Sequence, residues 1–233
     1  MSTDRPSPGQ AIRPEHIKRW GPTWSRRVGW FLAHVWWNTT VLGADRVPAT
    51  GPVLVASNHT SAIDGPLLHG AIGRGSHIIV KEEMFSGVIG FLLRNAGQIP
   101  VERKNGRAAL TTALALLNEG RVVGVFPEGT RGRGDVSSTK AGIAWLAVRS
   151  GAMVVPVAVL GSRRTGDKHG RIPGPRSRLF VVFGEPFVAA RPERGTGRAA
   201  VAEAMGVVQE QMSSQVRYAI ERTGVKLPDD SSV

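Results

Sequence analysis

Apolar residues along the chain follow two spacings, one typical of helices and one typical of buried strands. After a polar segment with three prolines over residues 1–20, apolar residues recur from Trp24 at i, i+4, i+7, i+8 and i+11, which predicts a helix over 22–42. A break rich in turn residues follows near 47–52, and beyond it short apolar runs alternate with helical patterns. These patterns predict strands over 53–57, 77–80, 98–102, 122–126, 154–160 and 179–183, and helices over 65–72, 84–95, 105–118, 139–149 and 201–219.

This alternation of strands and helices predicts an α/β fold. It favours a mixed or mostly parallel sheet that is flanked by helices on both faces. A domain boundary is plausible only near residues 43–51. We therefore expect an N-terminal arm and Trp-rich helix over 1–43, followed by an α/β domain over 44–233.

The N-terminal helix is unusual in its tryptophan content. Five of the six tryptophans lie between Trp20 and Trp37. The apolar stretch Val28–Trp37 is shorter than the ~20 residues that span a bilayer, and it lacks the cleavage site of a secretory signal. Arg26 and Arg27 near its start and the tryptophans suit a lipid headgroup region. The segment is either an amphipathic helix on a membrane surface or a helix packed against the α/β body.

The net charge of the chain narrows the classes of molecule that it could bind. The 233 residues carry 30 Lys and Arg against 18 Asp and Glu, for a net charge of +12, and no cysteine. Disulfides, thiolate metal sites and cysteine nucleophiles are thereby excluded, and an anionic partner is favoured. The aromatics cluster in the N-terminal helix whereas much basic charge lies over 163–178, so we expect no nucleic acid. That basic segment is a solvated loop or contacts an anionic partner such as phospholipid.

A histidine and an aspartate follow the first strand of the α/β region. His59 lies directly beyond strand 53–57, where α/β folds place their sites, and Asp64 starts the next helix. A tight turn would bring the carboxylate to Nδ1–H and leave Nε2 as a general base acting directly on a substrate hydroxyl. For an isolated pair of this spacing, a loop histidine beside a capping aspartate is the commoner arrangement.

A second polar motif, Phe126–Arg131, follows another predicted strand. Gly129 permits an unusual backbone, Arg131 offers a forked donor to phosphate or carboxylate, and Glu128 could order Arg131 or a substrate hydroxyl. Polar clusters at 81–84 and 102–104 also follow strands. In a parallel sheet all four strand ends would meet at one edge. A serine-hydrolase elbow, a phosphate-binding loop and a His-Glu-x-x-His motif are absent from the sequence.

These motifs, in this order, resemble the glycerolipid acyltransferase family typified by 1-acyl-glycerol-3-phosphate acyltransferases, the PlsC-like proteins. The resemblance covers about residues 45–187. The family's first block, Asn-His-x4-Asp, is matched by Asn58, His59 and Asp64, and its third, Phe-Pro-Glu-Gly-Thr-Arg, at every position from Phe126 to Arg131. The second block is matched by Lys81, Glu83, Gly90, Gly97 and Arg103, with Met84 in place of the usual Leu, and the fourth by Val155, Pro156 and Val157.

The resemblance implies a role for each matched residue. His59 would be the general base and Asp64 its orienting partner. Acceptor phosphate would be bound by Lys81, Arg103 and Arg131, and the acceptor pocket shaped by Glu128, Gly129 and Thr130. The resemblance implies no metal, and no cofactor besides the acyl donor, which would be acyl-CoA or acyl-carrier protein.

The resemblance also implies a substrate and a location. The expected acceptor is 1-acyl-glycerol-3-phosphate, which would yield phosphatidic acid, and the expected partner is a phospholipid surface. The enzyme would be peripheral or monotopic on the cytoplasmic face of the cell membrane. Another lysophospholipid, a glycolipid or an aminolipid stays open as acceptor. A basic membrane- or nucleic-acid-binding protein without catalysis stays open as a different class.

Overall fold

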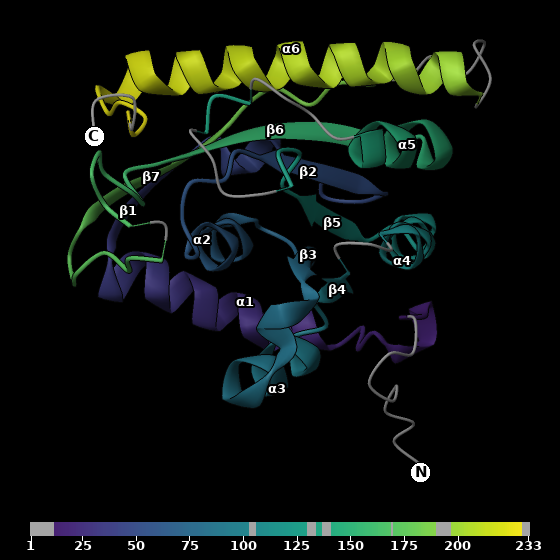
Figure 1. Ribbon diagram of the computed structural model, residues 1–233, viewed down its shortest axis with the longest axis horizontal. Coiled ribbons are helices and arrows are strands. Elements are labelled where there is room, and N and C mark those ends of the chain that lie inside the picture. The colour runs from purple at the N-terminus through teal and green to yellow at the C-terminus, as the bar shows by residue number, and fades with distance from the viewer. Residues whose placement is uncertain are drawn as a thin grey trace.

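A computed structural model describes residues 12–102, 106–129, 134–136, 141–168, 170–189 and 197–229. Its centre is a seven-stranded sheet in the order β1-β7-β6-β2-β5-β3-β4 (Figure 1). The strands are β1 (Asn38–Leu42), β2 (Val53–Ser57), β3 (Ser76–Lys81), β4 (Ile99–Val101), β5 (Val122–Val125), β6 (Met153–Leu160) and β7 (Arg178–Phe183).

Five of these strands run in one direction. β2 to β6 are mutually parallel, whereas β7 is antiparallel to β6 and β1 is parallel to β7. The mostly parallel sheet predicted from the sequence is thereby confirmed. Every residue of β2 is buried, and alternate residues enter two apolar clusters, with Leu54 and Ala56 in one and Val53 and Val55 in the other. A strand buried on both faces explains why its sequence is uniformly apolar.

Helices cover both faces of the sheet. α1 and α2 lie on one face and α4, α5 and α6 on the other, so α6 and α1 are on opposite sides in Figure 1. The helices are α1 (Gly21–Phe31), α2 (Asp64–Ala71), α3 (Gly87–Asn95), α4 (Arg107–Asn118), α5 (Ala141–Ser150) and α6 (Arg198–Thr223). Shorter turns are η1 (Pro14–His16), the π-helical η2 (Leu32–Trp36), η3 (Ala44–Arg46) and η4 (Glu82–Phe85).

Most predicted elements are confirmed with bounds shifted by a few residues, but the predicted N-terminal helix is partly wrong. It was expected over 22–42, and it ends at Trp36. Residues 38–42 instead form β1, which pairs with β7 over five residues. The β-branched residues Thr39, Thr40 and Val41 favour an extended strand. The segment predicted as a separate N-terminal unit thus contributes an edge strand to the sheet.

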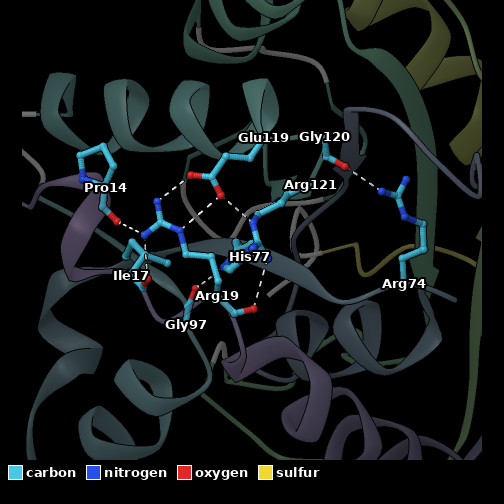
Figure 2. Close-up of polar contacts among 9 residues, drawn as sticks. All are labelled: Pro14, Ile17, Arg19, Arg74, His77, Gly97, Glu119, Gly120 and Arg121. Carbon is cyan, nitrogen blue, oxygen red and sulfur yellow. Dashed lines mark hydrogen bonds and ion pairs between the residues drawn. The ribbon is translucent and has the colours of Figure 1, made fainter.

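The start of this segment is held by a charged cluster at the amino ends of the parallel strands (Figure 2). Arg19 Nη2 donates to Glu119 Oε1 at 2.6 Å, and Arg121 Nε donates to Glu119 Oε2 at 2.8 Å. Arg19 also donates to the carbonyls of Pro14 and Ile17. The hydrogen bond from Arg19, and then that from Arg121, hold the pKa of Glu119 at about 2. The cluster therefore ties residues 14–19 to the α/β body.

The face that α1 turns inward is made of small residues. A Cβ placed on Gly70 of α2 would lie 2.3 Å from the carbonyl carbon of Gly29, so only glycines permit this close crossing. The large side chains of Trp30, Phe31 and Val35 face outward and are 50%, 51% and 55% exposed. An ordinary surface helix has the reverse arrangement, with its large apolar side chains in the core. Within the described residues, no helix is both long and apolar enough to cross a membrane.

Candidate active site

The loop that follows β2 is fixed to the neighbouring strand by an asparagine. Asn58 is fully buried; its Nδ2 donates to the Val159 carbonyl at 3.1 Å, and its Oδ1 accepts from the Val159 N–H at 2.7 Å. The amide side chain thus extends the ladder between β2 and β6 after the β2 main chain has turned away. The next residue, His59, therefore starts from a rigid position.

The structure brings His59 and Asp64 together at the carboxyl end of β2. Asp64 is fully buried, and its Oδ2 lies 3.1 Å from His59 Nδ1. The same oxygen accepts the main-chain N–H groups of Thr60 and Ser61, each at 2.7 Å. Because a carboxylate accepts hydrogen bonds, Nδ1 carries the imidazole proton and Nε2 is the basic nitrogen. This is the geometry that the spacing predicted.

Glu128 lies on the other side of the same loop. Its Oε1 accepts the main-chain N–H of His59 at 3.2 Å. Burial raises the pKa of Glu128 to about 7, and the nearby Asp135 and Asp64 act in the same direction. The N–H groups of His59 and Gly134 partly oppose the rise in this pKa. Glu128 therefore supports the His59 loop and titrates near neutral pH.

The motif that contains Glu128 also supplies a platform for the imidazole. The rings of His59 and Phe126 stack with centroids 4.2 Å apart and planes at 24°. Gly129 has a φ of 68°, a left-handed conformation that glycine adopts without steric cost, and its N–H donates to the Phe126 carbonyl at 3.0 Å. The tight turn leaves the His59 side chain 14% exposed.

An apolar cavity of about 350 Å³ opens at this histidine. His59, Phe126, Lys81 and Gly129 line it beside side chains from α1, α2, β3 and α3. Its volume is in the range of small-molecule sites. The apolar segment that the sequence predicted as a helix over 84–95 forms one wall. The wall includes Trp24 and Val28 of α1, Leu32 of η2, and Ile89, Leu92 and Leu93 of α3.

Five of the eight predicted site residues lie in the described part of the chain. His59, Lys81 and Gly129 reach the same cavity, and Asp64 and Glu128 are hydrogen-bonded to the His59 loop. Lys81 is the last residue of β3, as the strand-end argument required. The other three, Arg103, Thr130 and Arg131, lie outside the described residues.

Sequence reasoning missed several residues that build the site. It assigned no structural role to Asn58 or Phe126, although both lie in the recognised motifs. It also missed the 3.0 Å hydrogen bond between Thr60 Oγ1 and Ser162 Oγ, which ties the His59 loop to the segment after β6. The structural role of Asn58 could have been predicted from its position, because it is a polar residue directly after a buried strand. The partner of Thr60 is 102 positions away and has no local signal.

These observations define a class of protein. A histidine oriented by a carboxylate can remove a proton from a hydroxyl group, and the apolar cavity beside it suits a substrate with a hydrocarbon tail. The site is therefore that expected of an enzyme, with an oriented histidine beside an apolar cavity.

The sequence profile of the Acyltransferase family matches residues 38–160, and the chain belongs to this family. The chain is thus an acyltransferase, and the alternative of a non-catalytic binding protein is not supported.

Known proteins similar to this chain agree with that assignment. The 1-acyl-sn-glycerol-3-phosphate acyltransferase of Bacillus subtilis is 31% identical over 150 residues, which cover 63% of this chain and 72% of that protein. The human alpha enzyme of the same name is 34% identical over 125 residues, covering 51% of this chain and 44% of that protein. The chain spans about half the length of several such relatives.

A solved structure matches the fold. The 1-acyl-sn-glycerophosphate acyltransferase PlsC from Thermotoga maritima superimposes with a TM-score of 0.63 at 22% identity, covering 90% of this chain and 80% of that one. At this identity the likeness concerns the architecture.

Proposed function

We propose that the enzyme moves a fatty acyl group from the thioester of acyl-CoA or acyl-carrier protein to the free hydroxyl of 1-acyl-glycerol-3-phosphate, giving phosphatidic acid. The observation that carries the proposal is the 3.1 Å contact of His59 with Asp64 beside an apolar cavity that His59 lines. The names of the similar proteins support the choice of acceptor.

In the proposed reaction His59 acts as a general base. Its Nε2 takes the proton of the acceptor hydroxyl while that oxygen attacks the thioester carbonyl. The tetrahedral intermediate then expels the thiolate, which recovers the proton from the imidazolium, so the products are an ester and a thiol. Asp64 stabilises the imidazolium and keeps Nδ1 protonated. A general base contributes typically ~10²–10⁴-fold, so alignment of the two substrates supplies much of the remaining acceleration.

Cationic side chains would bind the acceptor's phosphate. Lys81, which reaches the cavity beside His59, is one such group, and by the family resemblance Arg103 and Arg131 are the others. Glu128, Gly129 and Thr130 would shape the acceptor pocket. Loss of a charge-assisted contact to phosphate costs about 1.5–3 kcal/mol, so Arg131→Ala should raise the KM for the acceptor more than that for acyl-CoA.

The cavity would hold a hydrocarbon chain of one substrate. Its walls are mainly aliphatic and aromatic, and they include the imidazole that the reaction needs. A chain seated there would place its carboxyl end beside His59 Nε2.

We further propose that α1 and η2 attach the enzyme peripherally to the cytoplasmic face of the membrane. The outward aromatic face of α1 supports this, because tryptophans favour the headgroup region. Deleting residues 1–42 is a poor test, since it would remove β1 and uncover α2. A triple variant, Trp30→Ser, Phe31→Ser and Val35→Ser, should lose vesicle co-sedimentation and retain activity on a short-chain soluble acceptor. The paired control is Val188→Ser with Tyr218→Ser, two exposed residues outside this segment.

An acceptor panel tests the proposed reaction directly. Purified enzyme is given labelled acyl-CoA with lysophosphatidic acid, another lysophospholipid, a glycolipid or an aminolipid, and the acylated product and released thiol are measured. Phosphatidic acid should be the main product. Preference for an acceptor without a terminal phosphate would overturn the assigned acceptor, and thiol release with none of them would overturn the reaction.

A further inference from the structure

The connection between β6 and β7 joins two strands at the carboxyl edge of the sheet. β6 ends at Leu160 and β7 begins at Arg178, and the two strands pair antiparallel. The connection between these strands therefore begins and ends at the edge at which β2 ends before His59. β1 begins with Asn38 opposite Arg178, so the end of η2 reaches this edge as well.

One part of this connection, the basic loop of residues 170–178, is fastened to the end of the Trp-rich helix. The Arg176 N–H donates to the Trp36 carbonyl at 2.7 Å. Trp37 Nε1 donates to the Pro173 carbonyl at 3.0 Å, and the Asn38 N–H donates to the Ser177 carbonyl at 3.0 Å. The loop and η2 thus form one continuous surface.

The charge on this surface is mainly positive, with Asp167 beside it as the acidic partner of Arg171. Residues 168–178 contain four cationic side chains and no Asp or Glu, and residues 20–44 contain Arg26 and Arg27 and no Asp or Glu. Arg176 is exposed, and the side chain of Arg171 is 66% exposed although it pairs with Asp167. Such a surface attracts an anionic partner.

Apolar side chains lie among these cations. Ile172 in the basic loop is 63% exposed, and Trp36, to which the loop is bonded, is 48% exposed. Arg176 has a φ of 57°, a left-handed backbone conformation that is strained for residues other than glycine. The loop therefore carries a charged side chain at a strained backbone position.

We infer that the basic loop binds the headgroups of anionic phospholipids, with Ile172 and the outward side chains of η2 entering the bilayer interface. Cations alone would suit the phosphates of coenzyme A or an acidic carrier protein. Exposed apolar side chains in the loop and in η2, whose main chain is hydrogen-bonded to the loop, fit the boundary between headgroups and acyl chains. The inference rests on the proposed function only in assuming a membrane-borne acceptor. Binding of the loop to these headgroups would hold the sheet edge that carries His59 against the lipid surface.

The test removes two charges from the loop and measures lipid binding in the absence of substrate. The variant Arg171→Gln with Arg176→Gln is compared with Arg217→Gln with Arg222→Gln, which removes the same charge from exposed positions on α6 across the sheet. Each full-length protein is sedimented with phosphatidylcholine vesicles, with and without phosphatidylglycerol, over a salt series.

The loop variant should lose about 5-fold in partition to anionic vesicles per cation, or about 25-fold in all, and change little on neutral vesicles. The wild-type preference for anionic vesicles should fall as salt rises. Equal binding of the loop and α6 variants to anionic vesicles would overturn the inference. A raised KM for the acyl donor with unchanged vesicle binding would assign the loop to the donor instead. Since no substrate is present during sedimentation, failure of the proposed reaction cannot make the loop and α6 variants bind anionic vesicles equally.

Discussion

Two glutamates at opposite edges of the sheet have pKa values that are displaced in opposite directions. Glu119, at the amino ends of the strands, is held at a pKa of about 2 by Arg19 and Arg121 (Figure 2). Glu128, at the carboxyl ends, is raised to a pKa of about 7 by burial, with Asp135 and Asp64 nearby. The hydrogen bonds to Glu128 that limit this rise come from main-chain N–H groups.

The difference separates a structural edge from a chemical one. At the amino edge polar groups are used to hold segments together: Arg74 donates to the carbonyls of Pro48, Gly51 and Gly120, and Glu119 joins two arginines. At the carboxyl edge the same kinds of group orient an imidazole that faces a cavity. Displaced pKa values gather at functional sites, but the surroundings decide what a displacement means.

Two other histidines show why a displaced pKa is insufficient evidence of catalysis. Burial lowers the pKa of His69 and of His77 to about 4. Both ring nitrogens of His69 are within 2.8 Å of serine hydroxyls, those of Ser25 and Ser76. His69 therefore joins α1 and α2 to β3 as a neutral linker and has no nitrogen left for a substrate.

The largest effect should come from His59→Ala. Loss of the base at the carboxyl edge should lower kcat by ~10²–10⁴-fold. The measurement is thiol release with a soluble short-chain acceptor, together with a thermal melt to verify folding. His34→Ala, at an exposed histidine of η2, is the control. Near-normal turnover in a folded His59→Ala enzyme would remove the proposed chemical role from this edge.

Asp64→Asn should lower kcat nearly as much as His59→Ala, by about 10²-fold or more, with a smaller effect on KM. An asparagine no longer holds the proton on His59 Nδ1, so the imidazole loses its orienting acceptor. The Oδ2 atom also accepts two main-chain N–H groups, so the variant's melting temperature must be measured beside its kinetics. A kcat equal to wild type would show that Asp64 only shapes the loop.

Glu128→Gln should raise stability at alkaline pH. A carboxyl group whose folded pKa is raised contributes stability below its unfolded value, near 4.5, and loses it as pH rises through about 7. After allowance for partial exposure, the variant should be more stable than wild type by about 1–2 kcal/mol at pH 8 and similar to it near pH 4.5. Denaturant melts at both pH values measure this. A constant difference between the two proteins would contradict the raised pKa.

Glu119→Gln should have the smallest effect and the opposite dependence on pH. A carboxylate whose folded pKa is lowered contributes stability above its unfolded value, and loses it as pH falls from about 4.5 to about 2. The group is partly exposed, so its loss should cost about 1 kcal/mol or less near pH 7. That deficit should narrow in acid, and kcat and KM should be unchanged. Altered kinetics would mean that the two edges are coupled.

Local sequence determined the central strands, the helices between them and the pair of His59 and Asp64 at the carboxyl edge of the sheet. His59 and Asp64 are five positions apart across one strand-to-helix turn, so the chain itself brings them together. Strand β1 was missed, because Val41 and Leu42 also continue a helical pattern and only the edge of β7 makes the strand favourable.

Tertiary structure decided the contacts between distant segments. Asn58 reaches Val159, 101 positions away, and the cavity exists only because α1 and α3 are placed beside the catalytic loop. The periodicity of residues 24–35 showed that one helical face is apolar, but it could not show whether that face is buried. The contact of Gly29 with Gly70 settles this, since two helices approach most closely where side chains are smallest. The small residues of α1 pack against α2, so Trp30 and Phe31 remain outside, whereas Trp24 and Val28 line the cavity.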